Sequence, residues 1–177
     1  MPKPGYVKAE PSWLSKDAVA QLAESVALQI PYSPGNDLEP ILKKIGGNLV
    51  VKDFWDLEDS DSGSIEVHGP SQFDIFVSNL TSGLRDRFTI AHEIGHFVLH
   101  YLLPRKRGVV IERMYATRYG SGREEWEANW FAASFLMPHK EFEAGFNLYR
   151  SVDAVAANFG VSRKAAEVRA KALHLLS

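Results

Sequence analysis

The stretch Thr89-Ile-Ala-His92-Glu93-Ile-Gly-His96-Phe-Val-Leu-His100-Tyr101 decides the fold, because this apolar segment carries two histidines four residues apart. In a helix, residues four apart lie on one face, so His92 and His96 can offer ring nitrogens to a single metal ion. Glu93 is one position further round the helix and can reach a water molecule on that ion. This is the H-E-x-x-H pattern of zinc hydrolases, in which the glutamate acts as general base.

The alternative interpretation of the same stretch is a buried helix with hydrogen-bonded core histidines. Residues 94–104 contain no Lys, Arg, Asp or Glu, so the helix is predicted to be buried nearly all round. A carboxylate and two imidazoles buried without partners would destabilise the fold by several kcal/mol. A metal ion satisfies all three groups together, and we therefore favour a metal site.

Composition limits what kind of metal site and what kind of protein this can be. The 177 residues are enough for one domain with a proper core, and the net charge of -2 provides no overall basic field for nucleic acid. The chain has no cysteine, which leaves His, Asp and Glu as the possible metal ligands. No apolar signal core or run of transmembrane length is found, so we expect a soluble, cytoplasmic protein.

Periodicity and capping signals predict helices on both sides of a small group of strands. This order favours an α+β fold, with a small, mostly antiparallel sheet packed on a zincin-like pair of helices. Residues 104–123 are basic and poorly periodic, and they are predicted to form a solvated loop or else a flap that helps to bind a substrate or partner. The expected helices are 15–30, 37–45, 85–104, 124–137 and most of 140–177, and the expected strands are 48–55, 65–67 and 73–78.

The third metal ligand must come from outside the H-E-x-x-H pattern, because catalytic zinc usually has three protein ligands. On a continuous helix His100 would lie about 12 Å from His92 along the axis, too far to share one ion. We therefore expect His100 to be a core histidine or a side chain that contacts a ligand.

The better candidates for the third ligand are the glutamates of the next helix. Glu125 lies above a stripe of mostly small residues, which lets another helix approach closely, whereas Glu127 lies above a bulkier face. Glu124 is the runner-up, and an exposed acidic first turn is the ordinary reading of all three. Asn129, one turn beyond Glu125, could orient a ligand histidine or simply bond a local carbonyl.

Two segments resemble the ImmA/IrrE family of bacterial zinc peptidases. They are Arg87-Phe-Thr-Ile-Ala-His-Glu-Ile-Gly-His96, followed by Leu99-His100, and Glu125-Trp-Glu-Ala-Asn-Trp-Phe-Ala-Ala-Ser-Phe-Leu-Met-Pro138. The resemblance implies a site-specific protease that cuts an Xre-type repressor and so releases mobile-element or stress genes. It also implies His92, His96 and Glu125 as zinc ligands and Glu93 as the catalytic residue. Ligand type alone does not exclude Mn²⁺ or Fe²⁺.

The C-terminal segment, residues 151–171, has the pattern of a helix-turn-helix. Gly160 is the expected turn and Ser162 the expected cap of the second helix. Arg163, Lys164, Arg169 and Lys171 could meet phosphates, but the negative net charge favours a structural or partner-docking role over DNA binding. We expect a metallopeptidase domain over residues 1–138 and a helical lobe over 139–177, packed as one unit.

Two further expectations concern the substrate of such a peptidase. The strand Phe73–Ser78, just before the metal helix, could pair with an extended peptide as an added strand. A donor for the oxyanion must also exist, and Tyr115, Tyr119 and His139 are candidates that the sequence cannot rank. The alternative function is a non-cleaving module that regulates by binding its repressor, or DNA, through residues 151–171.

Overall fold

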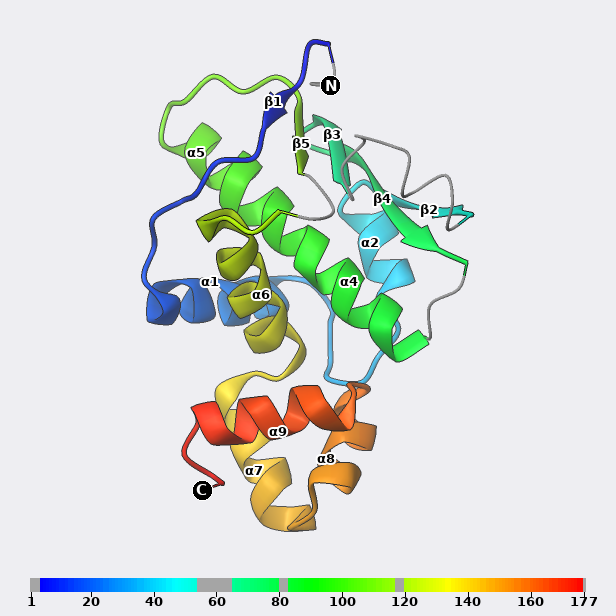
Figure 1. The fold of residues 1–177 in the computed structure, drawn as a ribbon, viewed down its shortest axis with the longest axis vertical. Helices are drawn as coiled ribbons and strands as arrows, with labels where there is room; N and C mark the ends of the chain where they lie inside the picture. The colour runs from blue at the N-terminus through cyan, green and yellow to red at the C-terminus, as the bar shows by residue number, and fades with distance from the viewer. Residues whose placement is uncertain (1–3, 54–64, 80–82, 117–119, 177) are drawn as a thin grey trace.

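A computed structural model describes residues 4–53, 65–79, 83–116 and 120–176 of the chain. It places a five-stranded sheet beside a long central helix, with more helices on the helix's other side and a group of three at the C-terminal end (Figure 1). The predicted α+β class is confirmed. None of the helices in the described ranges is long and apolar enough to cross a membrane.

The sheet has the order β1-β5-β3-β4-β2 and is mixed, whereas a mostly antiparallel sheet was predicted. A tight connection joins β3 to β4 and makes that pair antiparallel, and β5 is also antiparallel to β3. On the outer sides β2 runs parallel to β4, and β1 runs parallel to β5. The strands are β1 (Val7–Lys8), β2 (Gly47–Lys52), β3 (Ile65–Gly69), β4 (Gln72–Ser78) and β5 (Met114–Ala116).

The strand order corrects one functional expectation. The strand predicted at 73–78 is β4, and it lies between β3 and β2, so its backbone is already paired on both sides. An extended peptide therefore cannot be added to it, and the sheet edges are β1 and β2. The last residues of the strand predicted at 48–55 lie outside the described residues.

Two short strands were not predicted from the sequence. β1 has two residues and β5 has three, which is too short for an alternating pattern to be recognised. β5 lies inside the segment expected to be a solvated loop, yet all three of its residues are buried. Its pairing with β3 and β1 explains why the segment enters the sheet.

The helix that carries His92 and His96 is longer than predicted and changes from α-helical to π-helical winding. α4 (Gly83–His96) continues into a π-helical segment, η1 (Phe97–Leu102), and then into α5 (Leu103–Lys106). Pro104 was expected to end the helix, but it lies in the first turn of α5, where a missing backbone N–H is tolerated. Its neighbour Leu103 still donates its N–H to the carbonyl of Val98.

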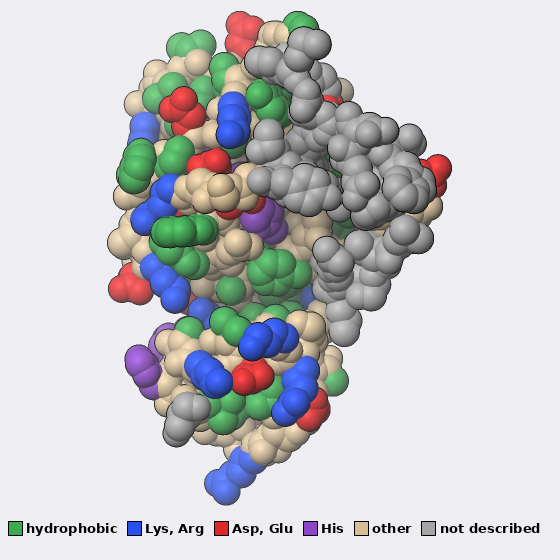
Figure 2. All heavy atoms as spheres, in the orientation of Figure 1, with side chains coloured by type: hydrophobic (Ala, Val, Ile, Leu, Met, Phe, Trp, Pro, Cys, Tyr) green, Lys and Arg blue, Asp and Glu red, His purple; other side chains and the backbone are tan. Residues whose placement is uncertain are grey.

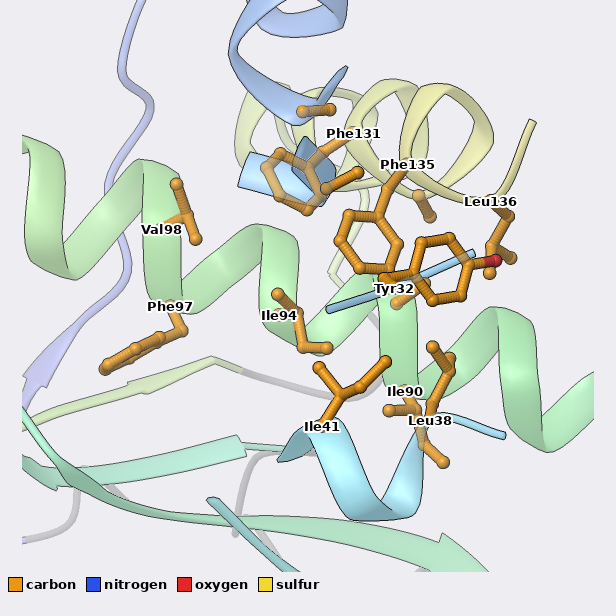
Figure 3. Close-up of a cluster of buried hydrophobic side chains, with 14 of the residues drawn as sticks. Tyr32, Leu38, Ile41, Ile90, Ile94, Phe97, Val98, Phe131, Phe135 and Leu136 are labelled. Atoms are coloured by element: carbon orange, nitrogen blue, oxygen red, sulfur yellow. The ribbon is translucent and has the colours of Figure 1, made fainter. Parts of the chain in front are cut away.

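The core joins this central helix to α6 on one side and to the sheet on the other. Figure 3 shows Ile94 of α4 between Ile41 and the pair Phe131 and Phe135 of α6, with Ile90 beside Leu38. Tyr32 stacks on Phe135 with ring centroids 4.7 Å apart. The other helices are α1 (Lys16–Gln29), α2 (Glu39–Lys44), α6 (Arg123–Leu136), α7 (His139–Tyr149), α8 (Val152–Phe159) and α9 (Arg163–Ala172).

The C-terminal helices form the predicted helix-turn-helix geometry. Ser162 caps α9 by accepting the N–H of Ala165, and Gly160 turns the chain in the left-handed region with φ of 61°. The Arg87 guanidinium of α4 donates to the Gly160 carbonyl at 2.9 Å and so ties this turn to the central helix. The division into residues 1–138 and 139–177 stays a prediction.

Arg169 has a different role from the one expected. Its side chain is buried, and its guanidinium donates to the Met137 carbonyl at 3.0 Å and to the Ser134 hydroxyl at 3.4 Å. It also lies 3.6 Å from a carboxylate oxygen of Glu24 in α1. This arginine therefore anchors α9 to α6 and α1 and cannot contact a phosphate on the surface.

Candidate metal centre

Two helices bring together the three side chains that the sequence singled out as ligands. α4 carries His92 and His96, and α6 carries Glu125. The two histidine Nε2 atoms are 3.1 Å apart. Glu125 Oε2 lies 3.2 Å from His92 Nε2, and Glu125 Oε1 lies 3.3 Å from His96 Nε2. Among the described residues, this group can hold a metal ion, and Glu124 is not part of it.

The helices come this close because small residues lie where their backbones meet. A Cβ atom added at Gly95 would lie 3.2 Å from the Cα of Ala128 and 3.1 Å from the Cβ of Phe131. This is the close approach that the small-residue stripe above Glu125 predicted. A larger residue at position 95 would push α6, and with it Glu125, away from the histidines.

The spacing of the three groups fits a tetrahedral ion. Zinc lies about 2.0–2.1 Å from nitrogen and oxygen ligands, and tetrahedral ligands at that radius are about 3.3 Å from each other. The two Nε2 atoms, 3.1 Å apart, are close to this value, as is the distance of 3.2–3.3 Å from each Nε2 to one of the two Glu125 oxygens. Within the described part of the chain, the buried Glu125 Oε1 also accepts no hydrogen bond, which suits a metal ligand.

Each histidine has a partner on its outer nitrogen. His92 Nδ1 lies 3.0 Å from the amide oxygen of Asn129, and His96 Nδ1 lies 2.9 Å from His100 Nδ1. Contacts of this kind orient a ligand imidazole and select its tautomer. Asn129 and His100 thus each contact one of the two histidines, and their role in orienting metal ligands stays a prediction.

The electrostatics of the group are dominated by burial and by mutual pairing. Burial lowers the pKa of His96 to about 4. Burial also opposes the charged form of His92, but its hydrogen bond to Glu125 and the charges of Glu93 and Glu125 outweigh this and raise its pKa. Burial opposes ionisation of Glu125 too, yet its close contacts with the two histidines hold its pKa at about 2. At neutral pH His96 is therefore neutral and Glu125 is ionised, the states that bind a metal.

Glu93 lies beside the group without belonging to it. Its side chain is buried, with a relative exposure of 2%. Its charge reaches His92, whose pKa it raises. A carboxylate in this place can take a proton from a water molecule near the three ligands.

Glu127 has a role that the sequence did not predict. Its position above a bulky face argued against a metal ligand, but its side chain is fully buried and contacts His100 at 3.1 Å. Arg123, four residues earlier, was the local signal of a paired carboxylate. The partners Ser12 and Trp13 are more than 110 residues away in the sequence and left no local signal.

The candidates for an oxyanion donor are not brought together. Tyr119 lies outside the described residues, so its predicted role stays untested. Tyr115 is buried in β5. His139 begins α7, is more than half exposed, and lies 3.9 Å from Glu143.

A groove of about 1040 Å³ is lined by residues of α1, α6 and α9. Asn129 of α6 is one of its lining residues and also contacts His92, whereas His92, His96 and Glu125 are not among them. In Figure 2, basic side chains gather on the C-terminal helices. The groove therefore lies beside the candidate metal site, and Asn129 belongs to both.

Comparison with known proteins agrees with this arrangement. The family model described as the IrrE N-terminal-like domain, Peptidase M78, matches residues 56–171. No curated protein matches the chain significantly. The structure is similar to that of a Mycobacterium tuberculosis transcriptional regulator, with a TM-score of 0.58 and 18% identity over 86% of this chain. The chain spans 46% of that protein, about half of its length, and at this identity the likeness concerns the fold. Since the family match extends over both helices of the metal centre and over the C-terminal lobe, the chain belongs to the Peptidase M78 family of IrrE N-terminal-like domains.

Proposed function

We propose that the protein is a zinc-dependent endopeptidase whose metal ligands are His92, His96 and Glu125. The observation that carries the proposal is the closeness of the three side chains: the two histidine Nε2 atoms are 3.1 Å apart, and each lies 3.2–3.3 Å from one of the two carboxylate oxygens of Glu125. Membership of a peptidase family supports the same reaction. Mn²⁺ and Fe²⁺ suit these ligands as well, and the metal analysis described below distinguishes them.

The residues around the site divide the reaction between them. Zinc bound there would supply the positive charge that acidifies a nearby water molecule and polarises the peptide carbonyl. Glu93 accepts the proton of that water as it attacks, and then delivers the proton to the leaving amine. Asn129 and His100 hold the ligand imidazoles in place through their outer nitrogens. Among the described residues, neither Tyr115 nor His139 is favoured over the other as the donor for the oxyanion.

We propose an Xre-type transcriptional repressor as the protein substrate, so that cleavage derepresses mobile-element or stress-response genes in the cytoplasm. The family match supports a regulatory peptidase, and the similar structure is that of a transcriptional regulator, which suits the same context. The groove that runs from Asn129 to α9 is large enough for a segment of such a partner.

Metal analysis of the purified protein is the first experiment. We expect one zinc ion per chain in the wild type and in Glu124→Ala, and loss of zinc in Glu125→Ala. Glu124 is the matched control, because it is the neighbouring carboxylate but lies outside the ligand group. If the wild type binds no metal after zinc is added back, the peptidase proposal is wrong.

The second candidate function is a module that regulates a repressor by contact alone. A Glu93→Gln protein that still relieves repression would favour it. DNA binding through α9 is less supported, because Arg169 is buried while Arg163 and Lys171 are paired with Asp153 and Glu167. Salt-dependent DNA binding that is lost when Arg163 and Lys164 are replaced by alanine would restore that reading.

A further inference from the structure

The carboxylate of Glu127 is a meeting point for three parts of the chain. Its Oε2 accepts the N–H of Ser12 at 2.8 Å, and its Oε1 accepts the N–H of Trp13 at 3.0 Å. Oε1 also accepts Nε–H of Arg123 at 3.1 Å. Backbone amides and a guanidinium can only donate, so the carboxylate is ionised and acts as the acceptor in every one of these contacts.

The fourth contact of Glu127 fixes the proton of a histidine. His100 Nε2 lies 3.1 Å from Glu127 Oε2, and an ionised carboxylate has no hydrogen to offer. The hydrogen between them must therefore be on His100 Nε2. A neutral His100 then has its lone pair on Nδ1.

This lone pair fixes the next histidine in turn. His100 Nδ1 lies 2.9 Å from His96 Nδ1, within hydrogen-bond distance, and both side chains are buried. Because His100 Nδ1 accepts, His96 must donate from Nδ1. The lone pair of His96 is then on Nε2, which lies 3.1 Å from His92 Nε2 and 3.3 Å from Glu125 Oε1.

We propose that Glu127 is a positioning residue which, through His100, holds His96 in the tautomer that leaves Nε2 bare for a metal ion. The inference rests on the proposed metal site. Without this constraint, His96 could carry its hydrogen on Nε2 and donate it to Glu125, which would close the site to the metal. The relay prevents that arrangement before any metal arrives.

The partner of the other ligand histidine provides an internal comparison. His92 is held by Asn129, whose amide can turn to present either an acceptor or a donor. A carboxylate can only accept, so the constraint on His96 is the stricter of the two. A fully buried carboxylate thus constrains His96 through His100, whereas a neutral amide contacts His92.

Glu127→Gln tests the proposal by replacing one carboxylate oxygen with an NH₂ group. The new NH₂ group can face either Trp13 and Arg123, which are two donors, or Ser12 and His100. The second orientation opposes only one fixed donor, because His100 can change its tautomer and accept. His100 then carries its hydrogen on Nδ1, donates it to His96 Nδ1, and forces the His96 hydrogen onto Nε2.

Two measurements read this change without using peptidase activity. In the metal-free wild type, ¹⁵N NMR of the imidazoles should show His96 with its hydrogen on Nδ1 and His100 with its hydrogen on Nε2. In Glu127→Gln both assignments should reverse. Zinc affinity, measured by competition with a chromogenic chelator, should fall about 10- to 100-fold.

Glu124→Gln is the matched control, since it removes a charge from the same helical turn but should leave both tautomers and the zinc affinity unchanged. Zinc affinity in Glu127→Gln equal to that of the control would overturn the proposal. If Glu127→Gln does not fold, the wild-type spectrum decides alone, and His96 with its hydrogen on Nε2 in the metal-free protein refutes the relay. Because the tautomers are read without metal, a failure of the zinc proposal would be seen separately.

Discussion

At the residue scale, the metal centre depends on which atoms are protonated as much as on where they lie. His96 is neutral because burial holds its pKa at about 4, and Glu125 is ionised because two histidines hold its pKa at about 2. Glu93 is buried next to His92 but contributes charge and no ligand atom to the group. Within five positions of α4, His92 and His96 are therefore proposed as ligands and Glu93 as the proton acceptor.

Glu93→Gln separates metal binding from chemistry. The amide keeps the size of the side chain but cannot accept the proton of a water molecule, so cleavage should fall by at least about 100-fold while one zinc ion per chain is retained. Zinc content and cleavage of an Xre-type repressor are measured on the same preparation. Cleavage at the wild-type rate would remove Glu93 from the role of general base.

The buried His96 should make the metal-free protein sensitive to mild acid. Its folded pKa of about 4 is below the unfolded value of 6.5, so between these values only the unfolded chain takes up the proton. Stability should therefore be complete above pH 6.5 and decrease as the pH falls, by about 2–3 kcal/mol at pH 4.5. His92 has a raised pKa, so its effect on stability changes only above pH 6.5.

Urea unfolding of the metal-free protein at pH 6.5 and pH 4.5 measures this dependence. His96→Gln is the comparison, because it lacks the imidazole and should lose most of the difference between the two pH values. An equal loss of stability in both proteins would place the acid sensitivity elsewhere in the chain.

At the element scale, the metal centre requires α4 and α6 to be in contact along their backbones. Gly95 of α4 faces Ala128 and Phe131 of α6, and the ligands are divided between these two helices. The π-helical segment that follows α4 is buried and continues the helix to His100 and beyond Pro104. Sequence periodicity predicted both helices, but it gave no sign of the π-helical winding.

Gly95→Ala should weaken zinc binding. The added Cβ would lie 3.1–3.2 Å from atoms of Phe131 and Ala128, one of them backbone, so α6 must shift. Overpacking of about 1–3 kcal/mol should exceed the gain of about 1 kcal/mol from higher helix propensity. We expect lower thermal stability and roughly tenfold lower zinc affinity, since a cost of 1.4 kcal/mol in the bound geometry is a factor of ten.

Gly145→Ala is the control for this prediction. Gly145 is also inside a helix, α7, and its added Cβ would meet the edge of the Phe159 ring at 3.2 Å. Its zinc affinity should equal that of the wild type, because α7 carries no ligand. If both variants bind zinc as the wild type does, the helix spacing does not limit the site.

At the scale of the whole molecule, one buried and one half-buried arginine connect the C-terminal helices to the rest. Arg169 joins α9 to the end of α6 and to Glu24 of α1, while Arg87 joins the turn before α9 to α4. Burial lowers the pKa of Arg169, partly offset by Glu24. The C-terminal helices are thus attached to the rest of the structure at two places, and Arg169 also lines the groove beside α6.

Arg169→Ala should destabilise the protein by roughly 2–4 kcal/mol, because the Met137 carbonyl and the Ser134 hydroxyl lose a buried donor. Urea unfolding measures the loss, and hydrogen exchange should be faster in α9 than in α4. Arg163→Ala is the matched control. Its partner Asp153 and Arg163 itself are both largely exposed, so its effect should stay under about 1 kcal/mol. Equal effects of the two substitutions would contradict the anchoring role of Arg169.

The sequence by itself determined the parts of this protein that depend on local spacing. The interval between His92 and His96, the small residues beside Glu125 and the cap at Ser162 are all set within one or two helical turns. Periodicity therefore predicted the helices and named the three side chains that the structure brings together, while their role as zinc ligands stays a proposal.

Only the tertiary structure decided the features that join distant segments. Glu127 meets Ser12 across 115 positions, β5 forms a strand because it pairs with β1 and β3, and Arg169 turns inward to Met137. Helical and strand periods report which face of an element is buried, but they do not report what that face meets. A buried carboxylate and an exposed one look alike in a sequence, since the difference lies in partners that folding brings from elsewhere in the chain.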